Sequence, residues 1–179
     1  MKQDQSGDHA LTHNNVAWSI AWILFFALSF SMFSVDLLMS LLPTWYSTIF
    51  GIYCFAGLFQ SSLAFLILMM FYFKKTGVIE GYYGIDHIHD VAKFLKGFTV
   101  FWAYIAFSQF MLIWYANIPE ETEFYLMRAE GGWMAISFGL LFFKFIIPFL
   151  ALLPRAVKRD EKQLPIICFL ILVMQYIDI

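Results

Sequence analysis

Charged residues are scarce in this chain: only 13% of its 179 positions are Asp, Glu, Lys or Arg. Soluble globular proteins carry about 25% charged residues, so this chain has too few to solvate the surface of a domain in water. Its formal net charge is −2, which excludes the basic surface that nucleic-acid binding requires. We therefore expect no nucleic-acid partner.

The chain also lacks the residue patterns of redox and metal centres. Its two cysteines, Cys54 and Cys168, lie inside apolar runs, where we expect small buried hydrophobic residues rather than a disulfide or a metal pair. There is no Cys-x-x-Cys-His motif for c-type haem. All four histidines lie outside the expected membrane spans: His9, His13, His87 and His89. We therefore expect that the chain itself holds no metal or haem and has no catalytic residue.

The N-terminus does not have the pattern of a secretory signal. Residues 1–15 are polar, with Lys2 as their one basic residue. The apolar run that follows is longer than the roughly 7–15 residues of a signal core, and no cleavage site follows it. We expect a polar segment over residues 1–15 and one helical bundle over residues 16–179.

Long apolar runs are what the chain has in abundance. It is 61% hydrophobic and 21% aromatic, and a helix needs about 20 apolar residues to cross a bilayer. The second and third runs have no charged face of the kind that a soluble helix presents to water. The sequence therefore predicts an all-α, polytopic transmembrane bundle with four full spans and a truncated fifth. The expected helices are Val16–Leu41, Ser47–Phe73, Phe98–Asn117, Trp133–Leu153 and Leu164–Ile179.

The charges in the loops predict an orientation. Of the four expected connections between helices, two are rich in lysine and arginine and two are not, and the two kinds alternate along the chain. By the positive-inside rule the N-terminus and both basic loops are cytoplasmic, whereas the Pro43–Tyr46 turn and the acidic loop around Glu120–Glu130 face the other side. The basic residues are Lys74, Lys75, Lys93, Lys96, Arg155, Lys158, Arg159 and Lys162.

Lys144 is the clearest functional candidate, because an ionisable group inside a span is costly and by default has a function. It lies near the middle of the fourth apolar run, and Pro148 follows four residues later. Proline clashes with the carbonyl four residues before it, so we expect a kink beside the amine. The pair suits a polar cavity or a proton path; the alternatives are an internal ion pair and a lysine that snorkels to the interface.

Other polar residues are weaker candidates for the same path. Asp36 follows a charge-free run and is either a proton exit group or a carboxylate at headgroup level. Tyr104 and Ser108 share a face of the third expected helix. Their hydroxyls could relay protons or only join helices by hydrogen bonds.

The segment around His87, His89 and Asp90 has a His-x-His pattern beside carboxylates. Two histidines do not make a zinc site, so we expect no metal here. The segment also has the pattern of a helix start with Asp86 as N-cap. It is either a proton entrance, a docking site for a partner, or a plain interfacial helix.

Three segments are distinctive: SVDLLMSLLPTWYSTIFGIY from Ser34 to Tyr53, HIHDVAKFLK at His87–Lys96, and TVFWAYIAFSQFMLIWYANIPEE at Thr99–Glu121. With IIPFLALLPR at Ile146–Arg155, they resemble the second quinone-binding-type membrane subunit (ActF-type) of bacterial alternative complex III. This family is related to the NrfD and polysulfide-reductase membrane anchors. The resemblance covers nearly the whole chain.

The resemblance implies a role in the respiratory chain. It implies a non-catalytic membrane subunit of a quinol:cytochrome c oxidoreductase in the inner (plasma) membrane, with iron–sulfur and haem subunits and an NrfD-like sister subunit as partners. It also implies proton translocation, with quinone bound in the complex. Members of the family are roughly twice as long, so we expect this chain to be a fragment.

Two other functions also fit the sequence. A stand-alone secondary transporter or channel fits the proline in the fourth span. A purely structural membrane anchor fits if the intramembrane polar residues only hold helices together.

The expected orientation can be tested with a topology reporter. A reporter inserted in the acidic loop after Glu123 should be active on the non-cytoplasmic side, and one inserted after Lys158 on the cytoplasmic side, because lysine and arginine are retained in the cytoplasm. A cytoplasmic signal from the acidic loop would contradict this orientation.

Overall fold

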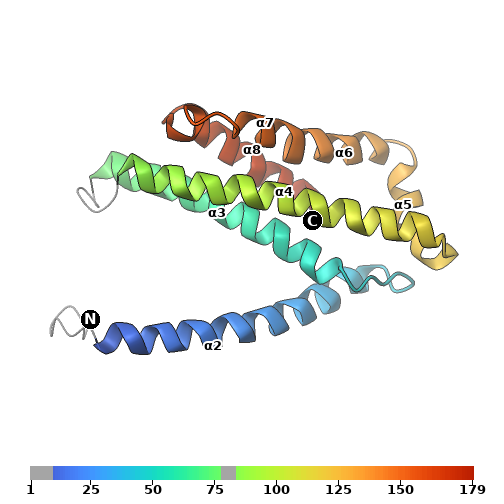
Figure 1. Ribbon diagram of the computed structural model, residues 1–179. Helices are drawn as coiled ribbons and strands as arrows, with labels where there is room; N and C mark the ends of the chain where they lie inside the picture. The colour runs from blue at the N-terminus through green and yellow to red at the C-terminus, as the bar shows by residue number, and fades with distance from the viewer. Residues whose placement is uncertain (1–9, 78–83) are drawn as a thin grey trace.

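The computed structural model describes residues 10–77 and 84–179, and within these ranges every regular element is helical (Figure 1). Four helical stretches are long and apolar enough to cross a membrane: residues Asn15–Leu41, Phe50–Thr76, Ile85–Ala116 and Trp133–Ala151. A shorter apolar helix follows at Gln163–Asp178. The protein is thus a multi-pass, membrane-embedded helical bundle, as the apolar runs predict.

The first helix, α2 (Ala10–Phe33), continues through a π-helical turn, η1 (Ser34–Leu38), and a 3-10 turn, η2 (Met39–Leu41). It begins inside the segment expected to be a polar linker, of which residues 1–9 lie outside the described ranges. Figure 1 shows that the C-terminal end of α2 approaches the start of α3, whereas the rest of α2 diverges from the other helices. Its apolar side chains, such as Trp18 and Leu28, are exposed, which suits a helix surrounded by lipid.

Helices α3 (Phe50–Thr76), α4 (Ile85–Ala116) and α8 (Gln163–Asp178) form the centre of the bundle. The packed core lies toward the end where α3 leads to α4, and it includes Ala64, Ala92 and Cys168, all fully buried. Small residues let helices approach closely in a membrane, where lipid tails are as apolar as leucine. Both cysteines are free, as expected.

Helix α4 begins 13 residues before the expected Phe98, so the His87–Lys96 segment and the third span are one continuous helix of 32 residues. The expected N-cap, Asp86, is wrong: Gly84 occupies that position, and its backbone N–H donates to His87 Nδ1 at 3.1 Å. Asp86 lies in the first turn instead, where a carboxylate favours the positive end of the helix dipole.

The fourth span is broken where the sequence predicts a kink. It consists of α6 (Trp133–Gly139), a π-helical segment η3 (Leu140–Ile146) and α7 (Ile147–Ala151). Lys144 lies in η3, and Pro148 lies in the first turn of α7. A π segment inserts a wider turn into a helix and is often found at functional sites. The distortion therefore accommodates the proline one turn beyond Lys144.

The loops meet in pairs at opposite ends of the bundle (Figure 1). At one end, Lys74 pairs with Glu161, and Arg159 in the short turn η4 (Val157–Arg159) pairs with Asp86. At the other end, Thr44 donates to Glu123 at 3.2 Å. The two basic connections thus lie together, as alternating topology requires.

The acidic loop contains a helix that the sequence analysis did not predict, α5 (Pro119–Ala129). Proline at its start, glutamates in its first turn and Arg128 in its last turn are common helix-terminus signals. Phe124 stacks on the buried Trp45 with ring centroids 4.0 Å apart. This contact joins α5 to the turn between the first two spans.

The packing of α3 against α8 can be tested at Gly57. A Cβ at this position would lie 2.6 Å from Gln175 Oε1. We expect Gly57→Ala to lower the free energy of unfolding by about 1–3 kcal/mol, because overpacking forces a shift of Gln175. Unfolding in mixed micelles measures it. Gly97→Ala on α4, where a Cβ would meet nothing within 4 Å, is the matched control and should not destabilise; equal effects would contradict the packing.

Candidate functional site

Lys144 is completely buried, with an exposed fraction of 0%, and lies on η3 facing α8 and α4. Its ammonium group donates to Asp178 Oδ2 and to Gln175 Oε1, the second at 2.8 Å. The same nitrogen lies 4.3 Å from the centre of the Trp102 ring, within range of a cation–π interaction. A buried charge must be paired and hydrogen-bonded, and all three contacts serve this need.

Asp178 joins Lys144 to a third helix. Its side chain is 5% exposed, and while Oδ2 accepts from Lys144, Oδ1 accepts from the hydroxyl of Tyr53 on α3. One carboxylate thus bridges an amine and a phenol from different helices. Lys144, Asp178, Gln175, Tyr53 and Trp102 are hereafter called the Lys144 cluster.

Local sequence explains why these groups converge. Gln175 and Asp178 are three residues apart on α8 and therefore share a face. Gly57 on α3 leaves room for the Gln175 amide, and Tyr53 lies one turn before Gly57 on the same helix. Trp102 stands on the buried face of α4 with its ring centroid 6.0 Å from that of Tyr53. Each of four helical segments, α3, α4, η3 and α8, thus contributes at least one side chain to the Lys144 cluster.

Chemically, the cluster is a short chain of groups that can exchange protons. The Asp178 carboxylate can accept a proton from Lys144 or Tyr53 without any change of contact, because both already donate to it. A buried carboxylate, amine and phenol in series suit proton transfer better than substrate chemistry.

Further buried polar atoms extend from the cluster along α3 and α4. Gln60 on α3 donates to Thr99 on α4 at 3.0 Å, and both side chains are fully buried. Gln60 Oε1, Trp102 Nε1 and Gln109 Nε2 are buried without a hydrogen-bond partner among the described residues. Buried polar atoms in proteins are usually satisfied, by water where no side chain is near.

Arg128 and Tyr125 of α5 mark the end of this line beyond Tyr53. The Arg128 guanidinium lies over the Phe124 ring, 3.4 Å from its centre. Burial lowers the pKa of Arg128, and the nearby Tyr53, Tyr125 and Asp178 oppose this effect. Burial also raises the pKa of Tyr125 to about 12. A positive charge therefore stands between the Lys144 cluster and this end of the bundle.

The other intramembrane candidates do not join the Lys144 cluster. Tyr104 is 63% exposed and Ser108 is half-buried. The face of α4 that turns inward carries Thr99, Trp102 and Gln109 instead. Asp36 is exposed in η1, and its backbone carbonyl accepts from Ser40. The predicted roles of these three residues in proton transfer remain predictions.

The histidine segment lies in the first turns of α4, at the basic end of the bundle. His87 is exposed, whereas His89 is buried, with its Nδ1 3.7 Å from the Asp90 carboxylate. Asp90 also pairs with Lys93 at 2.9 Å. In the part of the chain that the structure describes, no group of three or more His, Cys, Asp or Glu side chains is arranged to hold a metal ion.

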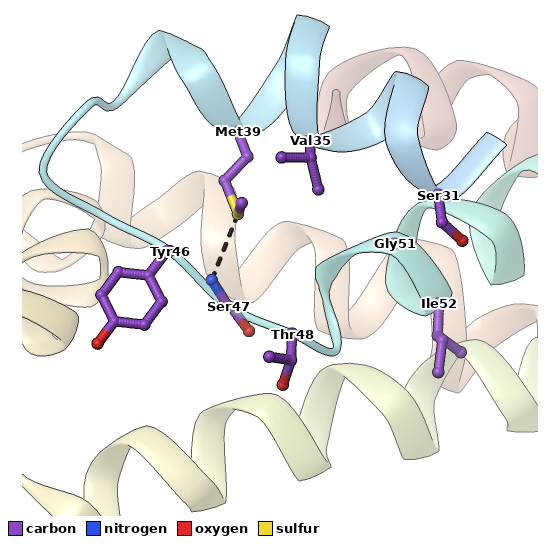
Figure 2. A pocket seen from close by; sticks show the side chains of 8 residues that line it. All are labelled: Ser31, Val35, Met39, Tyr46, Ser47, Thr48, Gly51 and Ile52. Atoms are coloured by element: carbon purple, nitrogen blue, oxygen red, sulfur yellow. Dashed lines mark hydrogen bonds between the residues drawn. The ribbon is translucent and has the colours of Figure 1, made fainter. Parts of the chain in front are cut away.

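A shallow cavity of about 230 Å³ opens beside η1, between the end of the first span and the start of α3. Figure 2 shows Met39 above the approach to α3, where the backbone N–H of Ser47 donates to its sulfur at 3.3 Å. The cavity is lined by Ser31, Val35, Met39, Tyr46, Ser47, Thr48, Gly51 and Ile52. None of these residues belongs to the Lys144 cluster, so the cavity and the cluster are separate features.

Sequence reasoning singled out Lys144 but missed its partners Asp178, Gln175 and Tyr53. A usable signal was present, since Asp178 is the one carboxylate of the last apolar run. A lone acid in one span and a lone base in another are expected to pair. No comparable signal identifies Tyr53 among the nine tyrosines.

Comparison with known proteins yields no assignment for the chain. No protein-family model matches it, and no curated protein matches it.

The pairing in the Lys144 cluster can be tested by unfolding. Lys144→Met and Asp178→Leu should each lower the free energy of unfolding by about 3–5 kcal/mol, because each leaves the partner buried and unpaired. The double variant should cost clearly less than their sum, since no uncompensated charge remains. Lys93→Met, which breaks an exposed pair with Asp90, is the control and should cost at most about 1 kcal/mol. Additive losses in the double variant would contradict the pairing.

Proposed function

We propose that this protein is a proton-conducting membrane subunit of a quinol:cytochrome c oxidoreductase. The observation that carries the proton-conducting part is the fully buried Lys144 ammonium, bridged by Asp178 to the Tyr53 hydroxyl inside helices that are otherwise strongly apolar. Ionisable residues at this depth in membrane proteins line ion pathways and proton relays.

The geometry supports a relay rather than a simple structural pair. A structural ion pair needs only two groups, whereas here the carboxylate has a proton-donating group on each oxygen. Beyond the cluster, buried polar atoms without partners extend toward Gln60 and Gln109. Water bound to these atoms would extend the cluster to the middle of the bundle at Gln60 and toward the acidic end at Gln109.

The proposed direction uses the charge distribution of the two ends. Protons would enter at the basic end, near His87, His89 and Asp90, and reach Lys144 through the region of Gln60 and Thr99. They would leave past Tyr53 toward Arg128 and the acidic α5.

Assembly into a respiratory complex is supported by the distinctive segments at Ser34–Tyr53, His87–Lys96 and Thr99–Glu121, which resemble the membrane subunit of alternative complex III. In this proposal the electrons travel through iron–sulfur and haem subunits. An NrfD-like sister subunit is a neighbour in the inner membrane, and quinone binds within the complex. The N-terminus is cytoplasmic.

Purification from native membranes in a mild detergent tests the assembly. An affinity tag on this chain should recover haem absorption and iron–sulfur electron paramagnetic resonance signals, together with quinol oxidation. Recovery as a lone oligomer without redox signals would contradict the complex and favour a transporter or channel.

Proton translocation during quinol oxidation tests the role of Lys144. In vesicles containing the complex, Lys144→Met should lower the number of protons translocated per electron while quinol oxidation continues, because the variant removes the amine that donates to Asp178 Oδ2. The control is Lys75→Met, which removes an exposed lysine at the end of α3. Unchanged coupling in Lys144→Met would remove this residue from the path and favour a purely structural subunit.

A further inference from the structure

The basic end of the bundle carries a concentrated group of basic side chains, of which the proposed proton path uses only His89. The turn η4 packs against the start of α4, which brings together bases from two segments distant in sequence. Around the buried His89 lie Lys93, Arg155, Lys158 and Arg159. Lys96 lies near Lys158 as well. These six residues are hereafter called the basic patch.

The patch is held by rigid contacts rather than by flexible side chains alone. Lys158 is buried, and its ammonium group donates to the carbonyls of Leu152, Leu153 and Pro154 at 2.8, 3.0 and 3.2 Å. These carbonyls end α7, where a cation is favoured by the helix dipole. Lys158 thereby anchors the turn that presents Arg155 and Arg159.

The charges of the patch are only partly neutralised. Lys93 pairs with Asp90, and Arg159 pairs with Asp86. Within residues 10–77 and 84–179, neither Lys96 nor Arg155 has an ion-pair partner, and Arg159 Nε is a buried donor without an acceptor. Burial and the neighbouring Lys96 and Lys93 lower the pKa of Lys158. Like charges in such proximity favour the binding of an anion among them.

The position of the patch indicates which anion. Helix α4 has 32 residues and is therefore about 48 Å long, whereas the hydrocarbon core is about 30 Å thick. Its charge-free part begins after Lys96, so Lys93 and Lys96 lie at the level of the lipid headgroups. Phe94 and Leu153, next to the patch in sequence, are 64% and 48% exposed. Charge at headgroup level beside exposed apolar side chains matches a phospholipid, with its phosphate and acyl chains.

We propose that the basic patch is a binding site for the headgroup of an anionic phospholipid. Lys96 and Arg155 contact the phosphate, while the acyl chains lie along Phe94 and Leu153. Clusters of basic residues at the cytoplasmic ends of membrane helices recognise anionic lipids in this way. The bound lipid would brace the contact of η4 with α4. The proposal is independent of proton conduction.

Native mass spectrometry of the full chain tests the site. The protein is reconstituted in bilayers of equal parts phosphatidylcholine and phosphatidylglycerol, extracted in a mild detergent, and the retained lipids are counted. The wild-type protein should retain phosphatidylglycerol in preference to phosphatidylcholine. Lys96→Gln and Arg155→Gln should each weaken this retention about fivefold, since one cation near a charged headgroup contributes about that factor.

Matched controls separate site binding from overall charge. Lys75→Gln removes one exposed positive charge at the same end, outside the patch, and should leave the retention unchanged. Thermal unfolding of each variant without phosphatidylglycerol checks that the fold is intact.

Three results would overturn the proposal. One is equal loss of phosphatidylglycerol in Lys75→Gln and in the patch variants. Another is retention of both lipids without preference. The third is saturation of the patch by inorganic phosphate alone with no preference for lipid, which would identify a site for a free anion. An acidic protein partner would be indicated if the patch variants lost such a partner but kept the lipid.

Discussion

The burial of the Lys144 ammonium group is the constraint on which the rest of the bundle depends. An unpaired charge in an apolar interior costs several kcal/mol even after relaxation, so the fold must bring a carboxylate to it. Asp178 meets this requirement only if α8 packs between η3 and α3, which is the observed arrangement. The pair thus specifies where α8 lies, much as a polar residue in a coiled coil specifies its register.

The same constraint explains several local features. Gly57 is required beside Gln175 because a larger residue would displace the amide from Lys144. Trp102 turns its ring toward the ammonium, and in doing so leaves its own Nε1 without a protein acceptor. Hydrophobic contacts pack the opposite end of α3, α4 and α8, around Ala64, Ala92 and Cys168. The bundle therefore has an apolar half that holds the helices together and a polar half that contains the Lys144 cluster.

Some of these features could be predicted from the sequence because they depend on local composition, and others could not because they depend on contacts between helices. Helices of the first four spans were predictable because each contains an apolar run of sufficient length, and Lys144 was predictable because it is the one charged residue inside the fourth. The partner Tyr53 was not, because pairing between helices is a tertiary property. Tyr104 and Ser108 were the candidates of this helix for the proton path, but Trp102 and Gln109 are the polar side chains that face the interior of the bundle. A helix that is apolar on all sides gives no periodic signal of its buried face. Helix α5 was missed because its terminal signals were read as loop charges.

The π-helical segment η3 has a consequence for how the fourth span presents its two halves. In an α-helix each residue advances the chain by about 100° around the axis, and a π turn takes up one residue more than an α turn. The side chains of α7 are therefore rotated by about this angle from the positions that a continuous α-helix would give them. The α6 half of the span can direct its aromatic residues to lipid while Pro148, in α7, is turned inward and buried. The span thus behaves as two helical segments that meet near Lys144 and whose side chains are rotated relative to each other about the helix axis. This rotation is consistent with the Lys144 ammonium group lying inside the bundle.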